Sequence, residues 1–397
     1  MWQRDELKRI NLLEGSVRSG KTWISLVLWA FWVGTMPKDG SYLMVAKTLT
    51  SLRRNVLDLL QSLVGARNFS YSLPKKEGRL FGRLVYLEGV NDARAESKIR
   101  GMTLQGAYCD ELTLFTQDFF AMLLSRLSEP GAKVIATTNP DSPNHWLMTE
   151  YIKRKDDDDG VDLLDIKYTL DDNTFLDPEY VKQIKREYTG VFYDRFVLGR
   201  WVLAQGRIYD MFDRSLHVVD APPGPCTAWY VSMDYGTSNP TAMLLWGKCG
   251  DTWYAVKEYY YSGRDERRQK TDEEYYAELE KLAGNHHVRK VIVDPSAASM
   301  IATIRKHGRY LVRPADNAVL DGIRTTATAL SSGRIKLCAC CVNTIREMET
   351  YVWDEKASEH GEDKPLKVND HGTDAVRYLC MEVFGRAAIG PVMIGGM

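Results

Sequence analysis

The chain has 397 residues, of which 44% are hydrophobic and 26% are charged. This composition is typical of soluble globular proteins and excludes a disordered or fibrous chain, and the length predicts two domains with a connector. Lys and Arg number 52 against 53 Asp and Glu, and this net charge of −1 excludes a uniformly basic nucleic-acid coat protein. A local basic groove is still compatible with the sequence, because residues 1–149 carry 19 basic and 14 acidic side chains.

The cysteines and the apolar segments predict a soluble protein of the reducing cytosol. The seven cysteines are odd in number and scattered, which argues against a disulfide framework. Cys338 and Cys341 have C-x-x-C spacing without a second Cys or His pair nearby, so packing at a strand end is favoured over a zinc site. A charged stretch follows Met1, which argues against a secretory signal, and the longest apolar run, residues 23–33, is shorter than the roughly 20 residues that span a bilayer.

Residues 10–34 have the pattern of a strand, a phosphate-binding loop and a helix. An apolar run over residues 10–13 predicts the strand, and the apolar segment 23–34 predicts a helix buried against a sheet. The loop matches G-x-x-x-x-G-K-T and consists of Gly15, Ser16, Val17, Arg18, Ser19, Gly20, Lys21 and Thr22. In such a loop, backbone N–H groups surround the phosphates, the lysine binds the β- and γ-phosphates, and the threonine hydroxyl ligates Mg²⁺. The sequence therefore predicts ATP and Mg²⁺ as cofactors.

Two further strand ends carry the polar groups that an ATPase needs. Asp110 and Glu111 follow a run of small and apolar residues, so Asp110 is expected to hold Mg²⁺ through water and Glu111 to polarise the attacking water. The alternative for an acidic pair is a helix cap. A third strand, residues 133–138, ends in Thr138 and Asn139, which either reach the γ-phosphate or begin an Asn-Pro turn.

Two arginines compete for the role of the cation that stabilises transition-state charge. Arg18 lies inside the loop, and Arg100 lies ten residues before Asp110. Either could be an arginine finger, and either could merely pair with a carboxylate.

The second half of the chain has the acidic pattern of a two-metal phosphodiesterase. Asp234 and Asp294 each end a predicted strand, and Asp374 lies near the start of a predicted helix. Two Mg²⁺ or Mn²⁺ ions about 4 Å apart need such carboxylates, so that one ion generates hydroxide and the other stabilises the leaving oxygen. Asp370 or His371 could complete the second site or handle the leaving-group proton. Taken singly, each of these aspartates could instead begin a turn or cap a helix.

Together, these motifs resemble the large subunit of tailed-phage terminases, the DNA-packaging motors. The matching stretches, in chain order, are GSVRSGKT, AYCDE, TTNP, a connecting stretch at residues 188–212, SMDYGTSNP, VIVDPSA and NDHGTDAVRY. The resemblance covers nearly the whole chain, and the order of the motifs is more specific than any one of them. It implies an α/β fold, in which an ASCE-type P-loop ATPase domain with a mostly parallel sheet precedes a ribonuclease H-like nuclease domain with a mixed sheet.

The resemblance also implies roles for individual residues. In the first half, Lys21 and Thr22 would bind ATP–Mg²⁺, Asp110 would bind the metal and Glu111 would be the catalytic carboxylate. Thr138 and Asn139 match the coupling motif, Arg100 matches a finger donated to the neighbouring subunit, and Asp234, Asp294 and Asp374 match the nuclease metal ligands, with His371 close by. Only fourteen residues precede Gly15, so the adenine-reading segment is short, and Trp2 and Gln3 are its candidates.

The predicted organisation is an ATPase domain over residues 1–165, a helical lid or linker over 166–205, a nuclease domain over 206–385 and a mobile tail over 386–397. The acidic run at 156–159, with Asp162 and Asp165 beyond it, is expected to be a solvated turn. DNA contacts require local basic clusters. The three candidates are Lys47, Arg53 and Arg54; Lys75, Lys76, Arg79 and Arg83; and Arg264, Arg267, Arg268 and Lys270.

The predicted function is an ATP-driven translocase that threads double-stranded DNA into a procapsid and cuts the concatemer. Its expected partners are the portal protein, the procapsid, the terminase small subunit and further copies of the chain in a ring, expected to be a pentamer, in the cytoplasm of the infected bacterium. Without a portal, only weak self-association is expected. The alternatives are a P-loop helicase or repair ATPase fused to a nuclease, for which strand-separating motifs are not found, and a binding scaffold with degenerate sites.

Overall fold

The computed structural model describes residues 6–90, 95–236 and 239–385 of the chain. The chain divides into two compact units, which are described separately. The N-terminal unit comprises Met1–Val181, Val191–Leu203 and Glu359–Glu362, and the C-terminal unit comprises Lys182–Gly190, Ala204–Ser358 and Asp363–Met397. The predicted lid or linker, residues 166–205, is thus shared between the two units.

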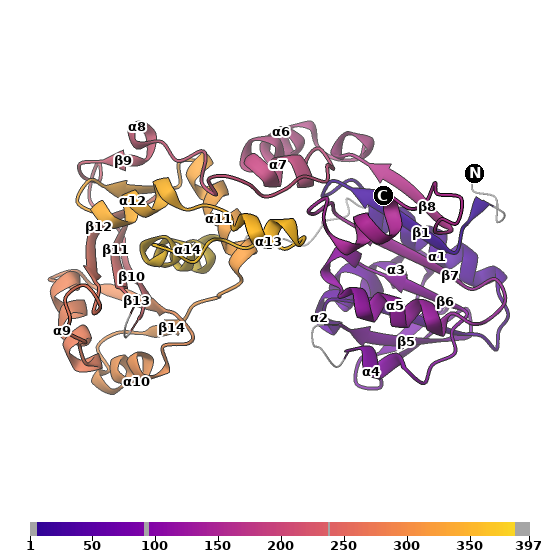
Figure 1. Cartoon of the computed structure of the whole chain (residues 1–397). Coiled ribbons are helices and arrows are strands. Elements are labelled where there is room, and N and C mark those ends of the chain that lie inside the picture. The colour runs from indigo at the N-terminus through magenta and orange to yellow at the C-terminus, as the bar shows by residue number, and fades with distance from the viewer. Residues whose placement is uncertain (1–5, 91–94, 237–238, 386–397) are drawn as a thin grey trace. The chain divides into compact units, whose positions relative to one another are not determined.

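A mostly parallel sheet forms the centre of the N-terminal unit (Figure 1). Among the described residues its strands are, in spatial order, β3 (Phe69–Ser72), β4 (Glu77–Leu80), β5 (Arg83–Gly89), β2 (Ser41–Ala46), β6 (Gly106–Cys109), β7 (Lys133–Thr138), β1 (Ile10–Gly15) and β8 (Leu163–Tyr168). Only β3, β4 and β5 pair antiparallel. Because β6, β7 and β1 are parallel neighbours, their carboxyl ends meet at one edge of the sheet.

Helices cover both faces of this sheet, which explains why its strands are apolar runs. On β1, Ile10 and Leu12 belong to one core layer with α5, whereas Leu13 belongs to the other layer with α1. The helical segments are α1 (Lys21–Thr35), α2 (Leu49–Leu52), η2 (Arg53–Leu57), α3 (Asp58–Val64), α4 (Ala95–Ile99), η3 (Leu112–Leu114), α5 (Gln117–Arg126), η4 (Leu147–Ile152), η5 (Leu170–Asp172), α6 (Pro178–Glu187) and α7 (Gly190–Phe196).

The C-terminal unit is built on a mixed sheet. Its strands are, in spatial order, β14 (Val312–Pro314), β13 (Val288–Val293), β10 (Ala228–Asp234), β11 (Thr241–Cys249), β12 (Thr252–Tyr261), β15 (Ile335–Cys338) and β9 (Val218–Val219). The pairs β10–β11 and β11–β12 are antiparallel, and the other pairs are parallel. Since β10 and β13 are parallel neighbours, the two strand-end aspartates that follow from the sequence reach the same edge.

The two faces of this second sheet have different partners. On β10, Val231 and Met233 pack in a core with residues of α9 and α10, while Ser232 and Asp234 point to the opposite face. On that face α14 packs against α11 and α12 (Figure 1). The helices are α8 (Arg214–His217), α9 (Asp272–Ala283), α10 (Ala298–His307), α11 (Val319–Ser331), α12 (Val342–Thr350), α13 (Glu355–Glu359) and α14 (His371–Phe384). The alternation of β10 therefore directs Asp234 toward α14.

One pair of cysteines is joined, although their odd number and scattered positions argue against a disulfide framework. Cys226 and Cys249 form a disulfide with Cα atoms 4.4 Å apart. They are 23 residues apart in sequence, but antiparallel pairing places Ala228 opposite Lys248 and so brings both cysteines to the same end of the β10–β11 ladder. Cys338 and Cys341 are free and buried, as expected for packing at a strand end.

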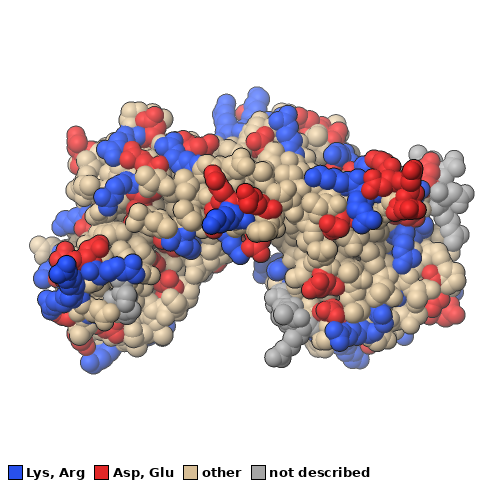
Figure 2. Space-filling view, viewed as in Figure 1, with Lys and Arg blue, Asp and Glu red and all other residues tan. Residues whose placement is uncertain are grey.

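Charged side chains of both signs are interspersed on the face shown in Figure 2. Arg83, which was assigned to a basic cluster, is buried, and its guanidinium donates to the carbonyl oxygens of Gly34, Met36 and Phe81. The assignment of Arg83 to a DNA-binding cluster is wrong, because its guanidinium is hydrogen-bonded to carbonyl oxygens at the C-terminal end of α1. Asp165 likewise lies on β8 and pairs with Lys155 at 3.0 Å instead of belonging to a solvated turn.

Within the described ranges, no helix is long and apolar enough to cross a membrane.

Two candidate functional sites

The predicted phosphate-binding loop connects the end of β1 to the start of α1. Its backbone has positive φ at Gly15, Arg18 and Gly20, and Gly20 precedes the first residue of α1. At position 15 only glycine fits, because a Cβ there would overlap the carbonyl oxygen of Tyr168 on the neighbouring strand β8. The glycine at the start of the motif is thus required by strand packing as well as by the turn.

The Lys21 side chain is folded into this loop and is buried. Its Nζ donates to the carbonyl oxygens of Gly15 (3.0 Å) and Ser16 (2.5 Å) and to Asn139 Oδ1 (3.1 Å). Burial lowers the pKa of the Lys21 ammonium to about 8, although nearby carboxylates, Glu111 foremost, favour the charged form. The Lys21 ammonium is hydrogen-bonded to neutral oxygens and is removed from water, so an anionic ligand in the loop would stabilise its charged form.

The predicted acidic pair follows β6 at the same sheet edge. Asp110 is buried, and its Oδ1 accepts from the Thr137 hydroxyl at 2.9 Å. Burial raises the pKa of the Asp110 carboxyl, against the hydrogen bonds from Thr137 and Asn55 and the charge of Lys21. Glu111 has a positive φ of 56°, and its backbone N–H donates to Thr137 Oγ1 at 3.2 Å. Lys21, Asp110 and Glu111 are therefore close enough for the charge of the lysine to interact with both carboxylates.

The two residues predicted at the end of β7 behave differently. Asn139 reaches the loop through its contact with Lys21, whereas the Thr138 hydroxyl donates to Thr113 Oγ1 at 2.9 Å. Asn139, which directly follows β7, thus contacts the loop through Lys21, and Thr138 contacts the turn after Glu111.

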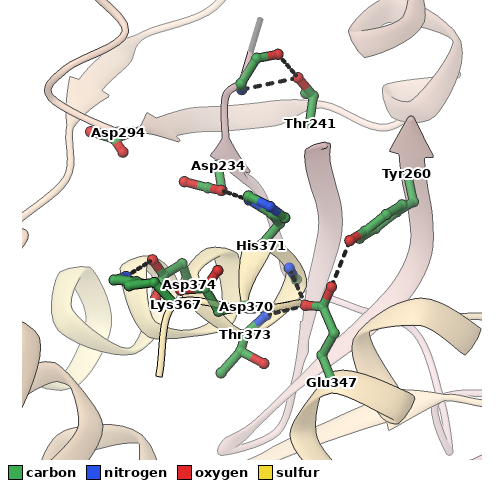
Figure 3. A network of polar contacts seen from close by, with 12 residues as sticks. Asp234, Thr241, Tyr260, Asp294, Glu347, Lys367, Asp370, His371, Thr373 and Asp374 are labelled. Atoms are coloured by element: carbon green, nitrogen blue, oxygen red, sulfur yellow. Dashed lines mark hydrogen bonds and ion pairs between the residues drawn. The ribbon is translucent and has the colours of Figure 1, made fainter. Parts of the chain in front are cut away.

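In the C-terminal unit, the end of β10 meets the start of α14. His371 Nδ1 lies 2.8 Å from Asp234 Oδ2, and Asp234 is 8% exposed (Figure 3). Burial raises the pKa of the Asp234 carboxyl; the hydrogen bond to His371 opposes this, and the charges of Asp374 and Asp294 add to it. Asp234 is therefore close enough to Asp374 and Asp294 for their charges to disfavour its ionised form, and a divalent cation would relieve this repulsion.

The Tyr378 hydroxyl lies between the two strand-end aspartates. It is 3.1 Å from Asp294 Oδ2 and 3.4 Å from Asp234 Oδ1. Tyr378 is buried on α14, one turn beyond Asp374, so one helix contacts both strand ends. Asp294 is further fixed by accepting from the Ser296 backbone N–H at 2.8 Å.

Asp374 points to two cationic side chains. Its Oδ1 pairs with Arg377 Nη2 at 3.0 Å, and its Oδ2 pairs with Lys367 Nζ at 3.2 Å. Lys367 also pairs with Asp370 at 3.0 Å. Within the described residues, no three His, Cys, Asp or Glu side chains are arranged to hold a metal ion. Asp234 and Asp294 are thus brought together around Tyr378, while Asp374 is drawn toward its basic partners.

Comparison with known proteins identifies both halves of the chain. Residues 12–216 match the family model of the terminase large subunit, T4likevirus-type, N-terminal, and residues 231–382 match that of the terminase RNaseH-like domain. The large terminase from the thermophilic bacteriophage D6E is 42% identical, with a TM-score of 0.87 over 95% of this chain and 94% of that chain. The large terminase subunit of Escherichia phage T5 is 24% identical over 272 residues, which span 66% of this chain and 60% of that protein.

The chain belongs to the bacteriophage terminase large-subunit family. Members of this family are DNA-packaging ATPases with a ribonuclease H-like nuclease domain, so the predicted family, fold class and activity class are confirmed. The alternative of a helicase or repair ATPase is not favoured.

The two candidate arginine fingers of this terminase lie in different surroundings. Arg18 is exposed in the loop, and its carbonyl oxygen accepts from Asn173 Nδ2 at 2.8 Å. Arg100 is exposed after α4 and pairs with Glu96 at 2.8 Å. Trp2 and Gln3, the candidates for reading adenine, lie outside the described residues.

Further residues near the two candidate sites could not be assigned from local sequence patterns. Glu347 on α12 accepts from the Gly372 and Thr373 backbone N–H groups at 2.6 and 3.1 Å (Figure 3). Arg377 and Tyr378 lie at the end of the stretch NDHGTDAVRY, whose pattern gives them no individual role. Near the loop, Trp201 Nε1 donates to Glu14 Oε2 at 2.6 Å, and no local sequence signal links these two residues.

Proposed function

We propose that the N-terminal unit hydrolyses ATP to move double-stranded DNA into a procapsid, and that the C-terminal unit cuts the DNA by metal-dependent phosphodiester hydrolysis. The observation that carries the motor assignment is Lys21, a buried ammonium that faces Asp110, Glu111 and Asn139 at one sheet edge. The large terminase of phage D6E, 42–43% identical to this chain, has been solved in complex with ADP and with ATP-gamma-S, which supports a nucleotide in the same loop.

Each ATPase residue would have a distinct task. The loop N–H groups from Arg18 to Gly20 would bind the phosphates, since those of Ser16 and Val17 donate to the carbonyl oxygens of Tyr168 and Phe196. Lys21 would leave its carbonyl partners for the phosphate oxygens. Thr22 and Asp110 would hold Mg²⁺, and Glu111 would orient and polarise the attacking water. Asn139 would exchange its contact with Lys21 for the γ-phosphate, which would report nucleotide state to β7, and Thr138 would support that turn.

The nuclease residues have the donor chemistry that Mg²⁺ or Mn²⁺ prefers. Asp234, Asp294 and Asp374 would be the ligands, and the mutual repulsion that helps raise the pKa of Asp234 supports this assignment. When bound, two such ions supply a hydroxide nucleophile and stabilise the leaving oxygen. His371, hydrogen-bonded to Asp234, would hold or pass the leaving-group proton, and Tyr378 would keep the two strand-end carboxylates at a fixed separation.

The ATPase assignment is tested with Lys21→Ala and Glu111→Ala. Both changes should reduce ATP hydrolysis at least 100-fold, since the first removes the phosphate cation and the second the group that activates water. Thr48→Ala, which removes the cap of α2 in the same unit, serves as the control. Wild-type hydrolysis rates in the two site variants would exclude this site.

The nuclease assignment is tested with Asp294→Ala and Asp234→Ala on plasmid DNA with Mn²⁺. Both should abolish cleavage while ATP hydrolysis continues. Cleavage by either variant at the wild-type rate would contradict the assignment of the metal ligands.

The choice between the two arginines is tested by mixing. If Arg100 acts in the neighbouring subunit, Arg100→Ala and Glu111→Ala proteins, each inactive, should regain some ATP hydrolysis when combined. Absence of rescue, with activity lost in Arg18→Ala, would favour a finger within the same subunit.

The proposed assembly is a ring of this chain, a pentamer, on the portal of the procapsid, with the terminase small subunit as a further partner, in the cytoplasm of the infected host. The proposed domain limits are 1–165 for the ATPase, 166–205 for the lid or linker, 206–385 for the nuclease and 386–397 for the tail. For DNA contacts we retain the three basic clusters without Arg83, whose guanidinium serves the backbone.

A further inference from the structure

We propose that Glu347 is a positioning residue of the nuclease site, whose buried carboxylate fixes the first turn of α14 and thereby places His371 and Asp374 against the sheet. The inference rests on the proposed nuclease function. It concerns a residue of α12 that lies outside every motif found in the sequence.

The contacts of Glu347 converge on the beginning of α14. The side chain is 1% exposed, and its Oε2 accepts from the backbone N–H groups of Gly372 (2.6 Å) and Thr373 (3.1 Å). Its Oε1 accepts from the Tyr260 hydroxyl at 2.6 Å (Figure 3). A remote carboxylate therefore satisfies N–H groups that a helix N-terminus leaves without intrahelical partners.

The helix has no local replacement for this cap. Its N-cap residue, Asp370, makes no side-chain hydrogen bond to the first turn, and its carboxylate instead pairs with Lys367. Removing Glu347 would thus leave the Gly372 and Thr373 N–H groups buried without a partner.

The local sequence is adapted to this contact. A Cβ on Gly372 would lie 3.0 Å from Glu347 Oε2 and would overlap the Thr344 hydroxyl, so any larger residue forces α12 and α14 apart. Thr344 is itself fixed, because its backbone N–H and hydroxyl both donate to Glu258 Oε1 at 2.7 Å. Gly372 thus permits a close approach that a neighbouring strand, β12, holds in place.

The turn that Glu347 caps carries the residues of the proposed site. His371 precedes Gly372 and bonds Asp234, and Asp374 follows Thr373. Displacing this turn would change the separation between Asp374 and the two strand-end aspartates, which are fixed independently by β10 and β13. Glu347 would act on the metal ligands through the backbone, without touching the metal or DNA.

The experiment compares variants of the full chain by titrating Mn²⁺ and measuring free Mn²⁺ by electron paramagnetic resonance, followed by plasmid cleavage. Glu347→Ala should weaken Mn²⁺ binding about tenfold or more, as is usual for residues that orient metal ligands. Glu347→Gln keeps an oxygen for the two N–H groups and an amide for Tyr260, so it should retain most of the wild-type affinity. Thr271→Ala is the matched control, because it removes the cap of α9, which carries no site residue.

Wild-type Mn²⁺ affinity in Glu347→Ala would overturn the proposal, as would an equal loss in Thr271→Ala. A loss in Glu347→Gln as large as in Glu347→Ala would assign the effect to charge and would also overturn it. If circular dichroism shows that Glu347→Ala does not fold, Gly372→Ala decides, since it retains the carboxylate and should show the same loss of Mn²⁺ affinity. Asp234→Ala identifies failure of the underlying function: if it still binds Mn²⁺ and cuts DNA, the nuclease site itself is misplaced.

Discussion

At the scale of single residues, the proposed nuclease site is arranged around charges that already have partners. Asp374 lies between Arg377, which is 1% exposed, and Lys367, whose side chain is 58% exposed. The guanidinium of Arg377 also donates to Asn317 Oδ1 at 3.0 Å, so it is held on two sides. Of the two cations, only the exposed Lys367 ammonium can move away from Asp374 at little cost in free energy, since its movement leaves no buried cation without a partner.

Lys367→Ala is therefore expected to increase the affinity for Mn²⁺ several-fold. In the native chain a metal ion at Asp374 must first displace an ammonium that pairs with both Asp370 and Asp374. The measurement is Mn²⁺ binding without DNA, so that any effect of the lysine on phosphate contacts is left out. Lys281→Ala, which removes a similar exposed ion pair with Glu278, should leave the affinity unchanged. Weaker binding in Lys367→Ala would contradict the displacement.

A second residue-scale expectation concerns pH. Burial raises the pKa of Glu347 above its usual 4.5, against the lowering effect of its hydrogen bonds from Tyr260 and two backbone N–H groups. Between 4.5 and the raised value the folded chain binds more protons than the unfolded chain, so the free energy of unfolding falls as pH rises through this window. Relative to Glu347→Gln, the wild type should lose stability from pH 4.5 upward, by at most about 1.4 kcal/mol per pH unit. Urea unfolding of both proteins measures this; parallel pH profiles would contradict it.

At the scale of elements, the phosphate-binding loop is held from outside by the segment 191–203. The Val17 backbone N–H donates to the Phe196 carbonyl oxygen at 2.8 Å, and Arg195 pairs with Asp141 at 2.8 Å. Asp141 follows Asn139 by two residues, so this segment contacts both the phosphate-binding loop and the turn after β7.

The close packing of this region gives a sharp test at Gly15. Gly15→Ala should destabilise the N-terminal unit by about 2–3 kcal/mol more than Gly82→Ala and should abolish nucleotide binding. Both glycines have positive φ, 137° and 83°, but only at Gly15 would a Cβ overlap a neighbouring strand; at Gly82 there is nothing within 4 Å. Urea unfolding and nucleotide titration measure the two effects. Equal losses in both variants would mean that backbone conformation alone, and not the contact with β8, sets the cost.

The elements that carry the motifs could be predicted from the sequence because each is a local pattern. The phosphate-binding loop and the ends of β6, β7, β10 and β13 lie where apolar runs give way to polar residues. Parallel pairing then brings the ends of β1, β6 and β7 together in one sheet and those of β10 and β13 together in the other. Glu347, Trp201 and Arg83 could not be assigned, because their partners lie at least 25 residues away or are backbone atoms. The disulfide between Cys226 and Cys249 depends on strand register, which the counting of cysteines does not reveal.

At the scale of the whole molecule, the near-neutral net charge of −1 is distributed over both units with the two signs interspersed (Figure 2). Many basic side chains have acidic partners, among them Lys76 with Glu88 and Lys270 with Glu278. Phosphate contacts in DNA binding must then compete with these ion pairs, which favours weak and salt-sensitive binding.

Each unit has its own sheet and core, and this predicts two calorimetric unfolding transitions that respond to different ligands. ADP should raise the midpoint temperature of the N-terminal unit alone, and Mn²⁺ that of the C-terminal unit alone. At a ligand concentration of 100 times the dissociation constant, each ligand should add about 2.7 kcal/mol to the free energy of unfolding of its unit. Lys21→Ala should cancel the first shift and Asp234→Ala the second. A shift of both transitions by either ligand would contradict independent units.

The alternation along β10 also constrains how this protein can evolve. Met233 faces the core with α9 and α10, and the next residue, Asp234, faces α14. Deleting or inserting one residue between Ala228 and Asp234 would exchange these two directions, sending a carboxylate into an apolar layer and a thioether toward His371. A substitution on this strand changes one side chain and can have a small effect, whereas a change of length by one residue reverses the direction of every side chain beyond it. Insertions and deletions among close relatives should therefore be confined to the connecting loops and spare this strand.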